Sequence, residues 1–337
     1  MSSPATFVTL VLDGNISVLP LTIRQGPPYL PHGAVLGLIP SRLPDIPISS
    51  VLIVIFVLSA TFNMTVLQLN LRRKHKFLLS GLLFGFSMAR MMANVLRIAW
   101  AVHNDNARLV IAASIFANAG VLLLFIVNLI LLQRIIRAYH PIIGWSKSLG
   151  WAFRFLYSCV VACLVMVIIS VVYSYYTTEP HIKSQLRTVR LTAAVFLAIL
   201  SFFPIPAVII TLLLPRSSPV DRFGSGSMHM KIILLIFTAA LLSLGASFRA
   251  AGAFIQRPVD NPGWFNSKAV YYCSNYLIEL IVVGSYSLSR FDRRFHVPNG
   301  SSAPGHYSSG GPSRTREKQN NADEETLDDE VTVAIRK

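Results

Sequence analysis

The sequence predicts an all-α membrane protein, a bundle of seven transmembrane helices with its N-terminus outside and its C-terminus in the cytosol. Three observations lead to this fold class: the composition, a set of apolar windows and the distribution of basic residues. Hydrophobic residues make up 53% of the 337 residues and charged residues only 13%, whereas an ordinary soluble domain is about 25% charged. With a mean hydropathy of +0.56, the chain is expected to need lipid as its solvent.

Seven windows are long and apolar enough to cross a bilayer, whose core of about 30 Å needs about 20 mainly apolar residues in a helix. They are residues 48–69, 77–100, 109–133, 155–176, 191–214, 232–254 and 269–288. The second carries Arg90 and Arg97, the fifth Pro204 and Pro206, and the seventh Glu279, so a six-helix bundle is the alternative. The two prolines also predict a kink in the fifth helix, because each removes a backbone donor.

The orientation follows from the basic residues between these windows, because short basic loops stay in the cytosol. One side collects fourteen of them: Arg72, Arg73, Lys74, Lys76, Arg134, Arg137, Lys147, Arg154, Arg216, Arg222, Lys231, Arg290, Arg293 and Arg294. The other side collects eight: Arg24, Arg42, Arg108, Lys183, Arg187, Arg190, Arg257 and Lys268. The first side is therefore expected to be cytosolic, which places the N-terminus outside.

Three segments are expected: an extracellular segment over residues 1–47, the seven-helix domain over 48–290 and a disordered cytosolic tail over 291–337. Ser, Gly and Pro are frequent from Asn299 onward, and an acidic run follows at residues 323–330. Asn15 begins a glycosylation sequon on the outer side, and the sequons at Asn63 and Asn299 are expected to be unused. No basic stretch precedes the first apolar residues, so a cleaved signal peptide is not expected. Together these features favour the plasma membrane.

Ionisable side chains inside the windows need partners, because a charge at a helix centre costs about 2.5–3.5 kcal/mol even on a lenient scale. Arg90, Asn94 and Arg97 are spaced to share one face of the second helix, and that face must point into the bundle. Arg97 lies near the outer boundary and is expected to reach out of the core. Arg90 lies near mid-depth, where Glu279, the only acidic residue within the windows, is its expected partner.

The seventh helix carries a second polar face, formed by Tyr272, Asn275, Glu279 and Tyr286, with Lys268 at its outer end. The candidate intramembrane polar site therefore consists of Arg90, Asn94, Asn118, Asn128, Arg249, Tyr272, Asn275 and Glu279. Two interpretations are equally weighted: these groups line a ligand cavity, or they only cross-link helices through ordinary interhelical polar contacts.

Several other chemistries lack their residues. The net charge of +15 is spread over the ends of apolar runs, which argues against a nucleic-acid face. All eight histidines lie in loops or tails, and there is neither a P-loop nor a nucleophile elbow, so we expect no enzyme activity, metal or cofactor. The cysteines are expected to be small buried hydrophobes: Cys159, Cys163 and Cys273. Aromatic residues near the outer boundaries read as an interfacial belt: Trp100, Tyr173, Tyr175 and Tyr176.

Three stretches carry a resemblance: HKFLLSGLLFGFSMAR at 75–90, QRIIRAYHP at 133–141 and RFDRRFHVPNG at 290–300. Together they resemble a fungal seven-helix membrane family known only as a domain of unknown function, which implies a multi-pass fold and no activity. A looser likeness, in helix number, orientation and the LQRII end of the third helix, is to the fungal lipid-translocating exporter and resistance family. The acidic and Tyr-Arg intramembrane patterns of that family are not reproduced here.

The leading hypothesis is a non-enzymatic protein whose polar interior binds or moves a small amphipathic or lipid-like molecule, with membrane lipids as its other partners. The first alternative is a seven-helix receptor, although the third helix ends in Gln133-Arg134-Ile135 where many receptors carry Asp-Arg-Tyr. The second alternative is a membrane scaffold without a ligand, in which the charges only set the helix register.

Overall fold

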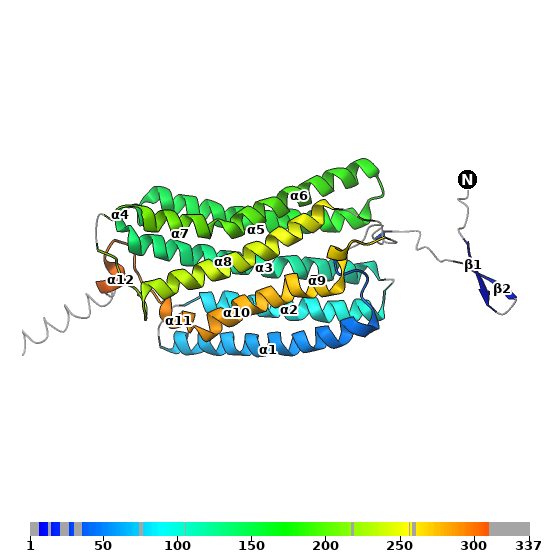
Figure 1. Cartoon of the computed structure of the whole chain (residues 1–337), viewed down its shortest axis with the longest axis horizontal. Helices are drawn as coiled ribbons and strands as arrows, with labels where there is room; N and C mark the ends of the chain where they lie inside the picture. The colour runs from blue at the N-terminus through cyan, green and yellow to red at the C-terminus, as the bar shows by residue number, and fades with distance from the viewer. Residues whose placement is uncertain are drawn as a thin grey trace, which may run out of the picture.

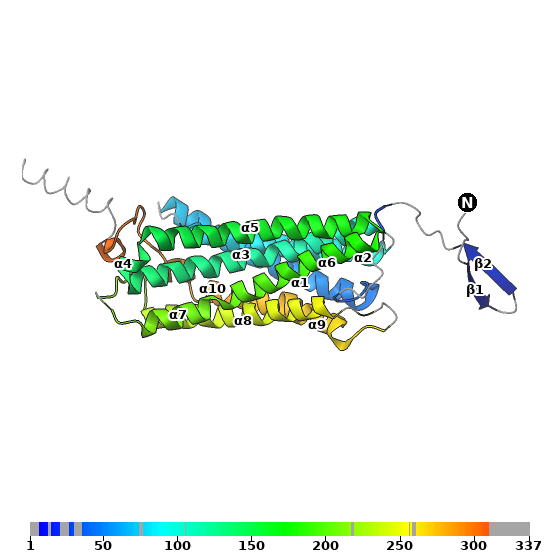
Figure 2. The same cartoon turned by 90° about the horizontal axis from the view of Figure 1, so that it is seen from above.

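The computed structural model describes residues 7–12, 15–20, 27–29, 36–73, 77–104, 106–216, 219–255, 257 and 261–309. Long helices lie side by side along one axis and form a single elongated bundle (Figures 1 and 2). Successive helices run in alternating directions, so every connection lies at one of the two ends. We call the end where the first helix begins end A, and the opposite end, where the last long helix finishes, end B.

Within the described residues, six helical spans are long and apolar enough to cross a membrane. They are α1 (Arg42–Arg72), α2 (Leu79–Val102), α3 (Ala107–Tyr139), α5 (Lys147–Tyr176), α6 (Pro180–Phe202) continued by α7 (Pro204–Leu213), and α8 (Met228–Phe254). Most of them extend beyond the expected windows, because hydropathy marks only the lipid-embedded part of a helix. This architecture is that of an all-α, multi-pass membrane protein.

The seventh expected helix is present as a helical segment but is not a regular α-helix. It consists of α9 (Lys268–Tyr272), the π-helical turn η2 (Cys273–Leu277) and α10 (Ile278–Leu288), which follow one another without a gap. A π-turn inserts an extra residue into the helix and is frequent at functional sites. The turn divides the segment into two short α-helices, and for that reason it is not among the six spans.

The fifth expected helix is interrupted where the two prolines predict it. The α-helical assignment stops after Phe202 and resumes at Pro204, and α6 runs in a different direction from α7 in both views (Figures 1 and 2). The kink prediction is therefore confirmed. Its consequence is that α6 leans away from the bundle axis toward end A.

The centre of the bundle is α3, which contacts α2, α5, α7 and α8. Of the six spans it is the most enclosed, with 56% of its most apolar stretch buried against 17% for α1. Large apolar side chains on the outside of the bundle remain exposed, among them Leu58, Phe155 and Ile199. Outward-facing apolar surface of this kind suits contact with lipid tails.

Short elements complete the ends. The 3-10 turn η1 (Trp264–Asn266) lies before α9 at end A, and α4 (Pro141–Gly144), α11 (Phe291–Arg294) and α12 (His306–Ser309) lie at end B. Two antiparallel strands precede the bundle, β1 (Phe7–Leu12) and β2 (Asn15–Pro20), in register from Phe7 opposite Pro20 to Leu12 opposite Asn15. The all-α expectation did not include this hairpin.

The first part of the expected disordered tail packs against end B. The Asp221 carboxylate accepts backbone N–H bonds from Gly305 at 3.0 Å, Tyr307 at 3.3 Å and Ser308 at 2.8 Å. Tyr307 is buried against Trp145, and burial raises the pKa of its hydroxyl. The acidic run at 323–330 lies outside the described residues, as does Arg24.

Candidate functional site

Arg90 and Glu279 form an ion pair at the centre of the bundle, as the sequence predicts. The Arg90 Nε–H donates to Glu279 Oε2 and the Nη2–H donates to Oε1, each at 2.5 Å, so the contact is bidentate. The remaining Nη1 donates to the Ala117 carbonyl at 2.6 Å. Both side chains are buried, with exposed fractions of 0% and 1%. The guanidinium is therefore almost completely paired within the bundle.

The same carboxylate also pairs with a second cation. Arg249 Nη1 donates to Glu279 Oε1 at 3.1 Å and to the Asn275 side-chain oxygen at 3.2 Å, while Asn94 donates to the Arg90 carbonyl at 2.8 Å. We call Arg90, Arg249, Asn275 and Glu279 the central cluster. It contains two cations and one anion, so one positive charge remains unbalanced.

A second cluster lies toward end A and corrects the expectation for Arg97. Asp45 is fully buried in α1 and pairs with Arg97 at 2.7 Å and Lys268 at 2.5 Å, and the Tyr272 hydroxyl donates to it at 2.8 Å. Arg97 is thus 3% exposed, and the expectation that it reaches out of the core is wrong. Glu279 is the only acidic residue within the seven windows. Asp45 lies before the first window, but α1 begins at Arg42, so the helix contains an acidic residue that the window does not.

A third polar group lies in the half of the bundle nearer end B. The Tyr286 hydroxyl contacts the side-chain oxygen of Asn128 and the hydroxyl of Thr238, the latter at 2.9 Å. All three side chains are buried. The expected polar face of the seventh helix is therefore real, but its members divide among three clusters at different depths.

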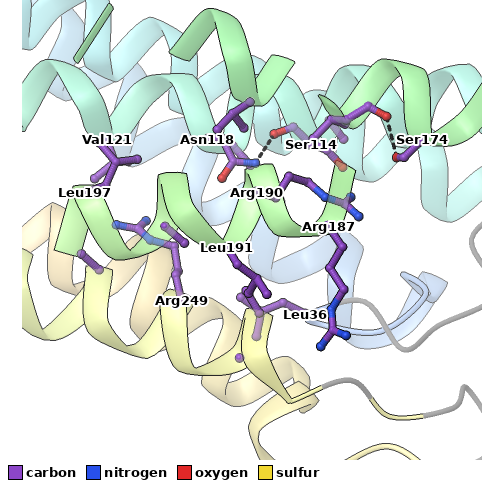
Figure 3. A pocket seen from close by; sticks show the side chains of 18 of the residues that line it. Leu36, Ser114, Asn118, Val121, Ser174, Arg187, Arg190, Leu191, Leu197 and Arg249 are labelled. Carbon is purple, nitrogen blue, oxygen red and sulfur yellow. Dashed lines mark hydrogen bonds between the residues drawn. The ribbon is translucent and has the colours of Figure 1, made fainter. Parts of the chain in front are cut away.

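A cavity of about 770 Å³ lies between α3, α5, α6 and α8, in the part of the bundle between end A and the middle. Its size falls within the range of about 300–1,000 Å³ for small-molecule sites. Figure 3 shows side chains from several of these helices converging on it. Of the expected site residues only Asn118 and Arg249 line it, together with Arg97 from the second cluster.

The wall of this cavity changes from basic to apolar with depth. Lys183, Arg187 and Arg190 line it from the first turns of α6, about 5–15 Å from the start of that helix at 1.5 Å per residue. Leu197 lines it about 25 Å along the same helix. Most of its deep neighbours are apolar: Val121, Leu122, Phe125, Cys163 and Leu164. The charged residue at this depth is Arg249, which is paired with Glu279. The cavity is therefore amphipathic, with its polar end toward end A.

The basic residues of α6 were missed as site residues, although the sequence carries a signal for them. Lys183, Arg187 and Arg190 are spaced i, i+4 and i+7, which places them on one helical face. This is the same spacing as Arg90, Asn94 and Arg97. The apolar window begins only at residue 191 and therefore predicts a loop for the three cations, whereas α6 begins at Pro180.

Other expectations are corrected by the same geometry. Trp100 and Tyr175, expected in an interfacial belt, are buried and line the cavity, while Tyr173 and Tyr176 are exposed. Cys163 is buried and Cys159 is half-buried, but Cys273 is exposed, so the expectation of a buried thiol is wrong there. Asn63 is buried, as expected for an unused sequon. Within the described ranges, no three His, Cys, Asp or Glu side chains gather closely enough to hold a metal ion.

Residues 221–296 match the model of a family described as a protein of unknown function (DUF3112). The match runs from the connection before α8 through the end of α11, so it includes Arg249, Asn275 and Glu279 but not the basic face of α6. It supports a resemblance to an uncharacterised family over this part of the chain. No curated protein matches the sequence, and no solved structure matches it.

Proposed function

We propose that this protein binds a small amphipathic, lipid-like molecule in the cavity and moves it between bilayer leaflets. The observation that carries the proposal is the gradient along the cavity wall, from Arg187 and Arg190 near end A to Leu197 and Phe125 at depth. A molecule with a polar head and an apolar chain matches both ends of this gradient. A small polar solute would leave the deep apolar wall unmatched, and a hydrocarbon would leave the cations unmatched.

The proposal includes seven membrane spans, with the π-interrupted segment from Lys268 to Leu288 as the seventh, and an N-terminus outside the cell. Under that orientation end A faces outward, in keeping with the smaller number of basic residues in its loops. The cavity then lies in the outer half of a plasma-membrane protein, where lipids of the outer leaflet are its nearest partners. No enzyme activity is part of this proposal.

A seven-helix receptor is the second candidate, and one observation favours it. The lining residues extend from end A only to the middle of the bundle, as with Phe125 on α3 and Leu197 on α6. Translocation therefore requires a further opening toward end B, whereas ligand binding alone does not. Recruitment of a G protein to the end B loops by a cavity ligand, without lipid movement, would support the receptor.

The test is translocation of a fluorescent single-chain lipid in proteoliposomes that contain the purified protein, with empty vesicles as the baseline. Ala194→Trp places a large side chain in the cavity wall, because Ala194 lines it. Val195→Trp is the matched control, since Val195 is the next residue and is 37% exposed on the outer side of α6. We expect protein-dependent translocation that falls at least tenfold in Ala194→Trp and stays near wild type in Val195→Trp.

Two other outcomes would count against transport in different ways. If the folded protein binds the probe but does not move it, the receptor becomes the better candidate. If the folded protein neither binds nor moves any single-chain lipid, a scaffold without a ligand remains, and the cavity has no amphipathic occupant.

A further inference from the structure

We infer that the cavity selects an anionic headgroup, and that Arg187 and Arg190 of α6 hold the carboxylate or phosphate of a single-chain amphiphile. This inference deepens the proposed function by naming the headgroup charge, and it rests on that function for the apolar chain. Figure 3 shows Arg187 and Arg190 on α6 nearer end A, and Arg249 on α8 deeper, beside Leu197 and Val121.

The charge count of the cavity wall is the first argument. Its lining residues include the cations Lys183, Arg187, Arg190, Arg249 and Arg257 as well as Arg97, and the residues known to line it include no Asp or Glu. Arg97 and Arg249 have carboxylate partners, at 2.7 and 3.1 Å. Among the ion pairs of the described residues, none involves Lys183, Arg187 or Arg190. The α6 face is therefore a set of cations without anions.

The clusters behind the wall do not supply the missing negative charge. In the central cluster Glu279 is shared by Arg90 and Arg249, and in the second cluster Asp45 is shared by Arg97 and Lys268. Each group has two cations for one carboxylate, so each retains one net positive charge. In a poorly solvated interior, these two net positive charges attract an anion in the cavity and so add to its preference for an anionic ligand.

The donors of Arg187 and Arg190 are also available. Arg187 Nη2 donates to the Phe254 carbonyl at 3.0 Å, while its buried Nε–H has no partner among the described residues. Arg190 lies within electrostatic reach of Arg187 and Tyr175. A guanidinium offers five N–H donors in a planar fork that fits carboxylate and phosphate oxygens. Both guanidiniums line the cavity from one face of α6, Arg190 on the side of Ser114 and Arg187 on the side of Leu36 (Figure 3), so an anionic head in the cavity has two guanidiniums within the same wall.

The position of this subsite sets the length of the ligand. Leu197 lies about 10 Å beyond Arg190 along α6, and the apolar lining begins in that interval with Leu191 and Ala194. An acyl chain attached to a head at Arg190 would therefore run directly into the deep part of the cavity. The volume of about 770 Å³ suits one chain better than a diacyl phospholipid.

The experiment measures binding of fluorescent probes to the purified protein in nanodiscs whose lipids carry no net charge. The probes share one acyl chain and differ in their head, which is a carboxylate, a phosphate monoester, a phosphocholine or an uncharged glycerol. We expect at least tenfold tighter binding of the two anionic probes than of the glycerol probe. Inorganic phosphate alone is the fifth probe, which separates a lipid headgroup from a free anion.

Variants connect the preference to the two arginines. We expect Arg187→Gln with Arg190→Gln to lower the affinity for anionic probes at least tenfold and to leave the affinity for the glycerol probe unchanged. The conservative pair Arg187→Lys with Arg190→Lys should retain most of the preference, which also shows that the site folds. The matched control is Lys147→Gln with Arg154→Gln, because both residues are exposed near end B and their loss changes the net charge equally.

The outcomes separate this inference from the proposed function. Equal affinity for all four heads, or the same loss in the control pair as in the α6 pair, would overturn anion selection and leave amphiphile binding intact. Binding of inorganic phosphate with no binding of any acyl probe would overturn the proposed function and leave the anion subsite. Binding of no probe at all by the folded protein would overturn both.

Discussion

The ion-paired clusters of the bundle and the basic face of α6 place similar residues in opposite situations. In the central cluster Arg90 reaches Glu279 twice at 2.5 Å and is completely buried. On α6, Arg187 and Arg190 line an open cavity with no carboxylate partner in the described structure. The cations of the clusters each have a carboxylate partner within the protein, whereas Arg187 and Arg190 have none among the described residues.

This difference teaches how to separate structural from functional charge inside a membrane. A buried pair fixes the positions of helices far apart in the sequence, as Asp45 does for α1, α2 and α9 through Arg97 and Lys268. Removing such a pair should mainly lower the free energy of unfolding. An unpaired cation in a cavity contributes little to the fold, and its removal should be felt mainly in ligand binding. The predictions below test this division, beginning with the largest effect.

Glu279→Gln should be the most destabilising change. It removes the carboxylate that contacts both Arg90 and Arg249 and leaves two cations close together in the interior. Removing one partner of a buried ion pair typically costs about 3–5 kcal/mol. Titration with sodium dodecyl sulfate, followed by circular dichroism or tryptophan fluorescence, measures this loss of unfolding free energy.

Charge reversal isolates the pair from its surroundings. Arg90→Glu and Glu279→Arg should each lower the yield of folded protein, and the double reversal should recover part of it, because the bidentate contact can form in the opposite sense. A double reversal no better than either single variant would show that the contact is incidental. The Arg90–Glu279 pair could then no longer serve as the example of a charge pair that stabilises the fold, in contrast to the cations of α6.

Asp45→Asn should have the next largest effect. It removes the anion shared by Arg97 and Lys268, but Lys268 is 21% exposed and can turn toward water at end A. Hydrogen bonds to charged groups contribute about 1.5–3 kcal/mol, so a loss in that range is expected in the same denaturation assay. Asp45→Glu is the control that retains the charge, and a full loss in that variant as well would attribute the effect to packing.

The sequence predicted the central pair because its two members are rare and lie at matching depths. A guanidinium near the middle of α2 needs an anion at the same depth, and the last apolar window offers only Glu279. The second cluster was not predictable in this way. Asp45 lies between Pro44 and Pro47, outside any apolar run, and only the structure shows that α1 begins early enough to bury it.

The cavity could not be predicted from the sequence, for a different reason. Hydropathy averages over all faces of a helix. The basic face of α6 lowers the mean hydropathy of its first turns, so the apolar window starts only at residue 191. The kink after Phe202 was predictable from Pro204 and Pro206, but the direction in which α6 then leans depends on packing against α5 and α8. A space between four helices is a tertiary property that no single window records.

Tyr286→Phe should have a smaller effect than either carboxylate variant. It removes only a hydroxyl between Asn128 and Thr238, and no charge is left unbalanced. Interhelical polar contacts in membranes average about 0.6 kcal/mol and reach about 1.7 kcal/mol. The same denaturation assay should show a loss in this range, with ligand binding unchanged. A loss as large as that of Glu279→Gln would mean that neutral contacts, rather than charge balance, dominate the stability of the bundle.

Arg190→Gln should have the smallest effect on stability, which makes it the direct comparison for Glu279→Gln. Arg190 has no carboxylate partner among the described residues and lies beside Arg187, so its removal breaks no ion pair and relieves a like-charge repulsion. Without ligand, we expect the unfolding free energy to change by less than about 0.5 kcal/mol, or to rise slightly. A saturating anionic probe should stabilise the wild type more than the variant, because a ligand stabilises a fold in proportion to its affinity. A strong loss of stability without ligand would instead place Arg190 among the structural charges. The distinction between paired and unpaired cations would then fail for a cation that has no carboxylate partner among the described residues.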